Sequence, residues 1–433
     1  MKFKAQDKQN QLIENITVHH LVVGVDIAQE VHVARAVNFR GIALGNSLEF
    51  RNYEEGFNSL RLWIRDLLAS YKLTTTIVGM APTGHYWLGL AHYLKESKFE
   101  AVLVNPHLVK KNKENRDNTR SKSDKKDALV IADMVKNGYY SPVRFHSAEY
   151  EELRVLMANR ESVVKRLVSA VNQIHRWVDI VFPEFRQVYK VLTCKGALAT
   201  LRLFPLPSDL RKLEPNDIIS GWRTLMQRHS GRRRAQLLID LAKQTVGSKQ
   251  ASYAYKLHLE HLLAEYDLAS AQLQRIEDEA KSGKILAISG ISSTALAGVL
   301  GEAGDLSGYT HGNALLRHAG LNLTEASSGK WKGQMTLSKR GRPRLRHFLY
   351  LMTMCMIMTN SEFMALHHHN VHVKKMKKMK SVVKLCGKLA RILVGLARSG
   401  VSYNPSNIRA LTRSVRKTDL HPLDRCNEGM IGL

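Results

Sequence analysis

Three aspartates in this chain have the residue type and the spacing of ligands for a divalent metal ion. Asp26 lies in the apolar stretch from Val22 to Ala28, where a charged group is costly unless it is paired or bound to a metal. Asp124 and Asp127 stand three residues apart before an apolar stretch, so both carboxylates would share one face of a first helical turn. A structural salt bridge for Asp26 and helix-capping roles for the other two are the alternative interpretations.

Together the three carboxylates indicate a two-metal phosphodiester site. Two Mg²⁺ ions about 4 Å apart would stabilise the attacking and the leaving oxygen of the reacting phosphate. Each aspartate alone is a weak signal. The prediction therefore depends on secondary-structure elements that bring residue 26 close to residues 124–127.

Alternating strand and helix patterns over residues 1–145 supply such elements. The expected strands are 21–28, 31–38, 42–50, 74–80 and 101–104, and the expected helices are 53–70, 85–97 and 125–136. Three hairpin-like strands followed by alternating helices and strands is the order of the ribonuclease-H-like fold, although many α/β folds share parts of that order.

Residues 146–282 are predicted to be mainly helical. A helix over 149–181 ends before Pro183, and a second helix over 252–282 carries a heptad seam. The seam residues are Leu259, Leu262, Tyr266, Ala269, Leu273 and Ile276. An antiparallel pair within one chain and a coiled coil between chains both remain open, and we expect a mixture of the two. The segment between the helices reads as a small helical insert with a basic turn over Arg228–Arg234.

Residues 283–415 are expected to form a third, helical region, and residues 416–433 a flexible tail. The segment from Ile288 to Ser292 resembles a helix-hairpin-helix turn, whose glycine would free backbone N–H groups to face a phosphate. An ordinary turn between two helices explains the same segment equally well.

In these motifs the chain resembles the insertion-sequence transposases related to the Piv DNA invertase, which are bridge-RNA-guided recombinases. Their RuvC-like first domain carries an Asp-Glu-Asp-Asp tetrad. Asp26 matches the first member in its Gly-x-Asp-Ile-Ala context, and Asp124 and Asp127 match the last two in their Asp-x-x-Asp context. The family's glutamate precedes a Pro-Thr-Gly-His-Tyr-Trp-like segment, and this chain has Ala81 there. We interpret Ala81 as a substitution, engineered or natural, that weakens metal binding and cutting while leaving the fold intact.

The resemblance extends to a second catalytic segment, from His318 to Gly329. It implies that Ser328, eight residues after Gly320, is the nucleophile, with Ser327 as the less favoured neighbour. A serine hydroxyl that attacks a DNA phosphate forms a phosphoserine link, which keeps the bond energy for rejoining.

Basic residues close to these segments are predicted to bind nucleic-acid phosphates. The candidates are Lys122, Lys125, Lys126, Lys330, Lys339, Arg340, Arg342, Arg344, Arg346, Lys374, Lys375, Lys377 and Lys378. We expect residues 110–126 to form a loop that nucleic acid orders. For residues 374–380 a solvated helix face is the alternative. The histidines at 367–369 and 372 are expected to form a polar helix end, because no acid or cysteine stands at metal-ligand spacing.

The bulk composition favours a polyanionic partner. Lys and Arg number 65 against 38 Asp and Glu, a net charge of +27, which attracts DNA or RNA. The apolar run from Phe348 to Met358 is shorter than the roughly 20 residues of a membrane span, and the polar start lacks a signal-peptide pattern, so we expect no membrane partner. Four scattered cysteines without CxxC spacing argue against a zinc module and fit buried free thiols in a reducing cytoplasm.

The sequence thus predicts an α/β plus all-α protein with a RuvC-like metal-binding domain (1–145), a helical coiled-coil region (146–282) and a helical transposase domain (283–415). By the resemblance, it is an RNA-guided DNA recombinase or transposase that uses Mg²⁺ and Ser328. The implied partners are a bridge RNA, donor and target DNA, and further copies of the chain in a dimer or tetramer, in the nucleoid-associated bacterial cytoplasm. Two alternatives are a RuvC-like nuclease or Holliday-junction resolvase that uses water, and a catalytically dead RNA- or DNA-binding protein.

Overall fold

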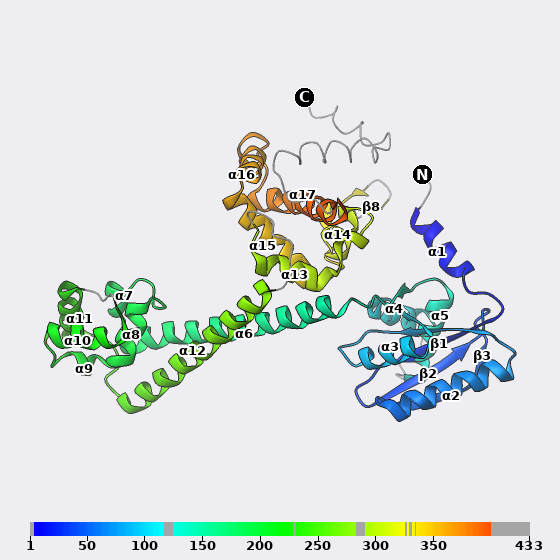
Figure 1. The fold of residues 1–433 in the computed structure, drawn as a ribbon, viewed down its shortest axis with the longest axis horizontal. Helices are drawn as coiled ribbons and strands as arrows, with labels where there is room; N and C mark the ends of the chain where they lie inside the picture. Colours follow the sequence, from blue (N-terminus) through cyan, green and yellow to red (C-terminus); the bar gives the residue numbers. More distant parts are fainter. Residues whose placement is uncertain are drawn as a thin grey trace. The chain divides into compact units, whose positions relative to one another are not determined.

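The chain folds into two compact units, Met1–Phe145 and His146–Leu433 (Figure 1). The structure, a computed structural model, describes residues 4–116, 124–227, 231–282, 291–324, 327–328, 331–333 and 335–399. Residues 288–290 of the expected helix-hairpin-helix turn lie outside these ranges, as do the basic residue Arg228, Cys426 and the expected tail.

A six-stranded mixed sheet forms the centre of the N-terminal unit. Its strands are β1 (His20–Asp26), β2 (Val31–Val37), β3 (Ala43–Arg51), β4 (Thr75–Met80), β5 (Glu100–Leu103) and β6 (Ser141–Pro142), in the order β3-β2-β1-β4-β5-β6. The first three strands pair antiparallel, β4 and β5 run parallel to β1, and β6 closes the edge antiparallel to β5. The predicted order of strands is therefore found.

Helices cover both faces of this sheet. They are α2 (Glu54–Ser70), α3 (Trp87–Glu96), α4 (Pro106–Arg116) and α5 (Asp124–Lys136), while α1 (Lys4–Glu14) contacts the chain after α5, where Gln9 Nε2 donates to the carbonyl oxygen of Asn137 (3.2 Å). The apolar faces of α2 and α3 pack into one core with alternate residues of β1, while α5 packs against the other face of the sheet. The prediction of a loop over residues 110–126 was wrong in part. Its beginning continues α4, where Pro106 suits a first helical turn, and its last three residues begin α5.

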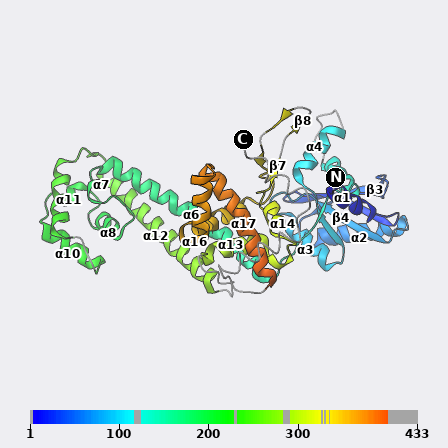
Figure 2. The same ribbon diagram turned by 90° about the horizontal axis from the view of Figure 1, so that it is seen from above.

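Two long helices, α6 (Ala148–Val181) and α12 (Ser252–Ser282), form an antiparallel rod in the second unit (Figure 2). Arg160 donates to Glu277 near one end (Nε to Oε1, 3.1 Å), and Trp177 Nε1 donates to the carbonyl oxygen of Tyr255 near the other (2.8 Å). The predicted seam of α12 faces α6, since its residues contribute to the apolar clusters that the two helices share. The pair within one chain, one of the two open interpretations, is thus present.

A helical head, residues 182–250, is inserted between the two rod helices. It comprises α7 (Phe185–Val188), α8 (Lys195–Leu203), α9 (Pro207–Leu210), α10 (Pro215–Leu225) and α11 (Arg232–Gln244). Its core surrounds Trp222, which is fully buried and donates from Nε1 to Thr200 Oγ1 (2.8 Å). The predicted basic turn was wrong at Arg232–Arg234, because these residues form the first turn of α11.

A helical bundle follows, with one apolar core that also receives Met157 of the rod. Its helices are α13 (Ser293–Ala303), the short η1 (Leu306–Gly308), α14 (Gly312–His318), α15 (Pro343–Thr359), α16 (Ser361–His368), the π-turn η2 (His369–Val373) and α17 (Lys378–Ser399). The prediction that this region is purely helical was wrong. Four two-residue strands lie between α14 and α15: β7 (Leu323–Thr324), β8 (Ser327–Ser328), β9 (Trp331–Lys332) and β10 (Thr336–Leu337).

Two further expectations concern thiols and membranes. Cys386 is buried beside Thr353, and burial raises the pKa of its thiol, whereas Cys194 is exposed, against the prediction of buried thiols. Within the described ranges no single helix is long and apolar enough to cross a membrane. Helix α15 and the stretch Ser361–Val373 reach that length and hydropathy only as a pair bent by 96°.

Candidate active site

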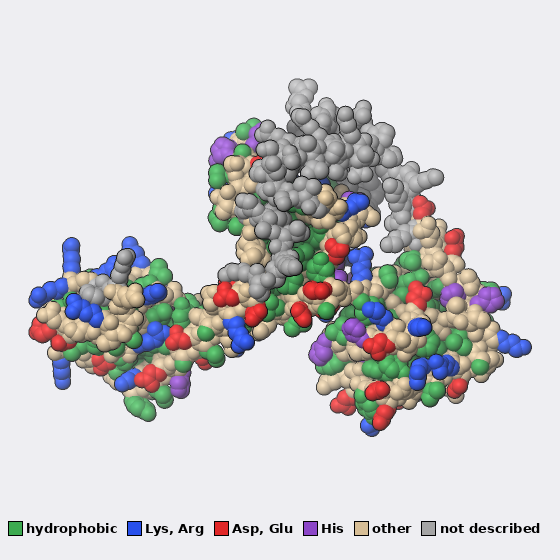
Figure 3. Space-filling model, viewed as in Figure 1, with side chains coloured by type: hydrophobic (Ala, Val, Ile, Leu, Met, Phe, Trp, Pro, Cys, Tyr) green, Lys and Arg blue, Asp and Glu red, His purple; other side chains and the backbone are tan. Residues whose placement is uncertain are grey.

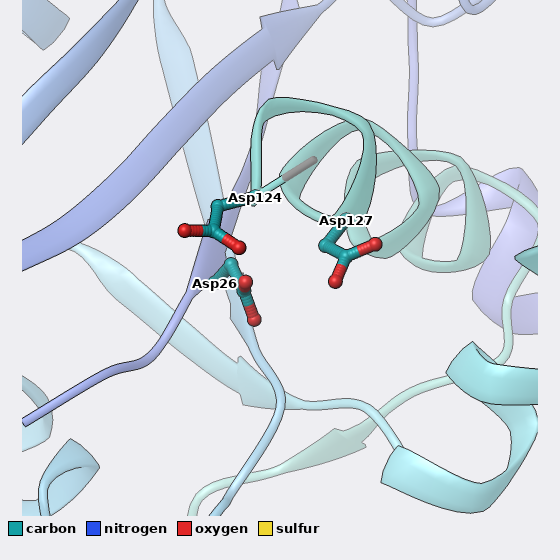
Figure 4. A group of neighbouring side chains, drawn as sticks. All are labelled: Asp26, Asp124 and Asp127. Atoms are coloured by element: carbon teal, nitrogen blue, oxygen red, sulfur yellow. The ribbon is translucent and has the colours of Figure 1, made fainter. Parts of the chain in front are cut away.

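The three predicted aspartates come together at one edge of the N-terminal sheet. Asp26 is the last residue of β1, and Asp124 and Asp127 lie in the first turn of α5 (Figure 4). One carboxylate oxygen from each lies within 4.8 Å of the others. Asp127 is buried, Asp26 is half-buried and Asp124 is exposed, so the cluster opens to solvent on one side.

Two glycines bring α5 close enough for this meeting. A Cβ atom at Gly24 of β1 would lie 2.1 Å from the carbonyl oxygen of Ala128 and 2.4 Å from the backbone nitrogen of Ala132. A Cβ atom at Gly79 of β4 would lie 2.3 Å from Val135 Cγ2. The backbone of α5 therefore rests directly on β1, the side chain of Val135 rests on β4, and the first turn of the helix reaches the end of β1.

Ala81 stands beside Asp26 on the same face of the sheet. Strands β1 and β4 are parallel, and Val25 pairs with Met80, so the next pair in register is Asp26 with Ala81. Paired residues of neighbouring strands present their side chains to the same face. Ala81 is only 4% exposed and belongs to the apolar cluster on the α5 side. A longer side chain at this position would start on the same face as Asp26.

Hydrogen bonds fix the loops that leave these two strands. Thr83 Oγ1 donates to the carbonyl oxygen of Ile27 (3.1 Å), which ties the loop after β4 to the end of β1. The backbone N–H of Ala28 donates to Nδ1 of His32 (3.2 Å), a fully buried residue that packs between Phe50 and Phe57. Sequence reasoning missed Thr83 and His32, because neither stands in a motif with the aspartates.

The donor set fits a hard divalent cation. Three carboxylates at this separation repel one another, and a cation or the positive end of a helix reduces that repulsion. Oxygen-only ligands suit Mg²⁺, Mn²⁺ or Ca²⁺ rather than Zn²⁺. Among the residues that the structure describes, this is the one grouping of His, Cys, Asp and Glu side chains that could hold a metal ion. The histidines around His368 therefore form no such group, and His368 and His372 stack with ring centroids 4.3 Å apart.

Ser328 lies near the end of a β-hairpin in the second unit. Strand β8 pairs with β9, with Ser328 opposite Trp331, and β7 pairs with β10 in the same antiparallel sense. The two ladders are separate two-stranded sheets, and their registers differ by one residue. Only two residues, Gly329 and Lys330, separate Ser328 from Trp331, and they lie outside the described ranges.

The residues at the outer end of the β7–β10 ladder, Asn322 and Ser338, are anchored to the bundle. Ser338 donates from its hydroxyl to Asn322 Oδ1 (2.8 Å) and from its backbone nitrogen to the Asn322 carbonyl oxygen (2.9 Å). Arg346 Nη1 donates to the carbonyl oxygens of Ala319 (2.9 Å) and Lys339 (3.4 Å), one on each side of this ladder. Arg346, predicted to bind phosphate, is thus engaged in holding the hairpin.

The other predicted phosphate-binding residues fall into three groups. Arg342 donates to the carbonyl oxygen of Glu302 (2.8 Å), Arg344 pairs with Glu161 (2.7 Å) and Lys125 pairs with Glu49 (3.3 Å). A second group is exposed, namely Lys126, Lys339, Arg340, Lys374, Lys375, Lys377 and Lys378. Lys122 and Lys330 form the third group, which lies outside the described ranges.

Comparison with known protein families gives matches over both candidate segments. Residues 23–183 match a family model for transposases of the DEDD type of IS110, and residues 283–368 match one described as transposase, IS116/IS110/IS902 family. The chain carries both domains of the IS110-type transposases. The predicted transposase class is therefore confirmed, on matches that include the three aspartates and Ser328.

Individual relatives of this transposase are distant. The mini-circle transposase for IS117 of Streptomyces coelicolor is 24% identical over 327 residues, which are 71% of this chain and 77% of that protein. A 44.8 kDa protein of insertion element IS116 of Streptomyces clavuligerus is 25% identical over 53% of this chain. The pilin gene-inverting protein of Moraxella lacunata is 23% identical over 41% of it. The chain spans 60% of the IS116 protein and 58% of the pilin gene-inverting protein.

Proposed function

We propose that this transposase cleaves and rejoins DNA strands at a composite site. Asp26, Asp124 and Asp127 would hold Mg²⁺ in a RuvC-like N-terminal domain, and Ser328 would be the nucleophile. The observation that carries the proposal is the convergence of the three carboxylates within 4.8 Å. The two family matches support it, because one covers the aspartates and the other covers the serine.

The proposed reaction is a phosphoryl transfer to serine and back. The Ser328 hydroxyl oxygen forms a bond to the DNA phosphorus, the bond from phosphorus to one deoxyribose oxygen breaks, and that oxygen takes up a proton. The hydroxyl of an exchanged strand then attacks the phosphoserine, which releases Ser328 and restores a phosphodiester. Bound Mg²⁺ would neutralise charge on the phosphate oxygens. The aspartates would hold the cation that binds the phosphate, and the anchored hairpin limits the positions that Ser328 can occupy.

We further propose that a bridge RNA selects the donor and target DNA, and that several copies of the chain assemble in the bacterial nucleoid. This part rests on the family resemblance and on the net charge of +27. A protein that reads the shape and backbone of nucleic acid can leave sequence readout to base pairing. Cutting and rejoining several strands needs more than one serine, hence a dimer or tetramer.

One observation favours a second candidate function, a protein that binds nucleic acid without cutting it. Ala81 lies in register beside Asp26, where the resemblance expects a glutamate, so metal binding is expected to be weak in this chain. A nuclease or resolvase that uses water is a third candidate, since it would need the carboxylates but no serine.

Restoring the carboxylate tests these functions. The Ala81→Glu variant is incubated with Mg²⁺, DNA of the element's ends and target, and the RNA transcribed beside the element, and a denaturing gel reports protein–DNA adducts. We expect an adduct in Ala81→Glu that disappears in Ala81→Glu/Ser328→Ala. Ala81→Gln, which has the same size without the charge, is the matched control and should form little adduct.

The outcomes separate the candidates. Cleavage without an adduct would exclude the serine mechanism and support the nuclease. Intact DNA in every variant, with nucleic acid still bound, would support the binding protein. Because Ala81 is buried, circular dichroism must first show that Ala81→Glu is folded, and the shorter Ala81→Asp replaces it if it is not.

A further inference from the structure

The head, residues 182–250, carries a surplus of positive charge that the site described above does not use. It contains 13 Lys and Arg against 5 Asp and Glu. Lys and Arg side chains project from several places on the face of the head drawn in Figure 3. The exposed ones include Lys190, Lys195, Lys212, Arg232, Arg233 and Lys249.

The acids of the head are largely occupied by its own backbone and loops. Asp209 and Asp217 accept from the backbone nitrogens of Leu206 (3.0 Å) and Glu214 (2.9 Å) at the starts of α9 and α10. Glu184 accepts from the hydroxyl of Thr245 (2.6 Å) and from the next backbone nitrogen (3.0 Å). Asp240 accepts a hydrogen bond from Gln236 (2.9 Å). Four of the five acidic residues of the head thus accept hydrogen bonds from within the head. Arg186 and Arg202 pair with Asp179 and Asp267 of the rod, and the head as a whole still has eight more basic than acidic residues (13 against 5).

The first turn of α11 places positive charge where it does not help the helix. Arg232, Arg233 and Arg234 open the helix, no acid stands in that turn, and the N-cap residue Gly231 offers no side-chain hydrogen bond. Cations oppose the dipole at a helix N-terminus. Positive charge at this end of a helix breaks a local stability rule, which points to a function for Arg232 and Arg233.

We propose that this surface of the head, centred on Arg232 and Arg233, binds the backbone of double-stranded DNA that flanks the reacting site. The inference rests on the proposed action on DNA. In the described part of residues 182–250 no aromatic side chain is exposed, and next to the head, at the start of α12, Tyr253 is an exposed ring, whereas proteins that bind single strands stack successive bases on several aromatic rings. Arginines on a surface without stacking groups suit the phosphates of a duplex.

The length of the rod favours a long partner over a small anion. Met157 belongs to the core of the bundle and Val181 to the core of the head, and 24 helical residues at 1.5 Å each separate them by about 36 Å. Roughly ten base pairs of duplex cover that distance. DNA that continues beyond the bundle can therefore reach the head.

Binding of a labelled 40-base-pair duplex, measured by anisotropy over a salt series, tests this proposal on the full chain with Ala81 in place. We expect Arg232→Gln/Arg233→Gln to weaken binding at least about fivefold and to reduce the salt slope by nearly two, because each phosphate contact adds about 0.9 to the slope. The control Lys256→Gln/Arg275→Gln removes the same charge from exposed positions of α12, outside the head, and should change affinity less than about twofold.

Other results would overturn the proposal. Equal weakening by both double variants would mean that only net charge matters, and no weakening would mean a merely solvated surface. Loss of binding to an RNA duplex but not to the DNA would assign the surface to RNA. A lower Tm in Arg232→Gln/Arg233→Gln would mark the arginines as structural, whereas we expect the Tm to hold or rise. Since the assay needs no cleavage, failure of the serine mechanism would leave its result unaffected.

Discussion

Gly24 and Gly79 determine whether the carboxylates can meet. Neither glycine is a ligand, and neither stands in a left-handed conformation. Their importance lies in the missing side chain, because the backbone of α5 occupies the space that a Cβ atom at Gly24 would take. The geometry of the aspartate cluster thus depends on a packing contact between the sheet and the helix.

Replacement of Gly24 by alanine should separate the helix from the strand. The added Cβ atom would meet backbone atoms at 2.1 Å and 2.4 Å, so the variant should lose about 1–3 kcal/mol of stability as an overpacked core and bind Mn²⁺ more weakly. Thermal unfolding and metal titration measure both effects. Gly89→Ala is the control, because its Cβ atom would lie 3.7 Å from Phe57 inside helix α3, where alanine is favoured. A Gly24→Ala protein as stable as its parent would contradict this account.

His32 makes the stability of the protein at the end of β1 depend on pH. Burial lowers the pKa of this imidazole below its ordinary 6.5, and its Nδ1 accepts from Ala28, two residues after Asp26. The neutral ring therefore carries its proton on Nε2. The unfolded chain binds a proton more readily than the folded one, so this contribution to stability is complete above about pH 6.5 and is lost as the pH falls below it.

A series of Tm measurements between about pH 7 and pH 5 checks this linkage. The His32→Asn variant keeps an acceptor for the Ala28 N–H but does not titrate, so its Tm should fall less on acidification than the parent's, even if its stability at neutral pH is lower. The pKa of His20 is also lowered mainly by burial. The dependence of Tm on pH in His20→Asn is therefore compared with that in His32→Asn. An unchanged dependence of Tm on pH in His32→Asn would show that other groups dominate.

At the scale of elements, the rod is held by an apolar seam inside one chain. Val163 of α6 is 1% exposed and packs in one cluster with Ala269 and Ile276 of α12. Val168, one turn further along α6, is 52% exposed. The contrast between these two valines distinguishes the seam from the outer surface of the rod.

Truncation of each valine separates pairing within the chain from pairing between chains. Val163→Ala should cost about 1–3 kcal/mol, since it removes two buried methyl groups and leaves a cavity, and it should increase hydrogen exchange along α6 and α12. Val168→Ala should change stability by no more than about 0.5 kcal/mol. A comparable loss in Val168→Ala would instead indicate that a second copy of the chain covers the outer face.

The elements also show where sequence patterns suffice and where they fail. The long helices and the first four strands carry clear periodicity, and their boundaries fall within a few residues of the prediction. The hairpin around Ser328 has strands of two residues, too short for alternation to be visible. Helix α4 has few apolar residues, so its basic composition favoured a loop. The contacts of Thr83 and His32 depend on tertiary structure that no local pattern encodes.

For the whole molecule, the net charge predicted a nucleic-acid partner but not where that partner binds. Residues 1–145 hold 21 Lys and Arg against 15 Asp and Glu, whereas residues 146–433 hold 44 against 23. Most of the surplus therefore lies outside the unit that carries the aspartates. The separation suggests that the first unit positions a phosphate and the second supplies most of the long-range attraction for the polyanion.

The insertion of the head into the rod has a consequence for what could replace it. The backbone nitrogen of Ser248 donates to the carbonyl oxygen of Ile180 (2.9 Å), so the polypeptide leaves the rod and re-enters it at almost the same point. At such a junction the two ends of the inserted segment lie close together. An inserted module of another length would not require the rod helices to be re-threaded, but it would still have to cover Trp177, Leu259 and Leu262, which share one apolar core with the head.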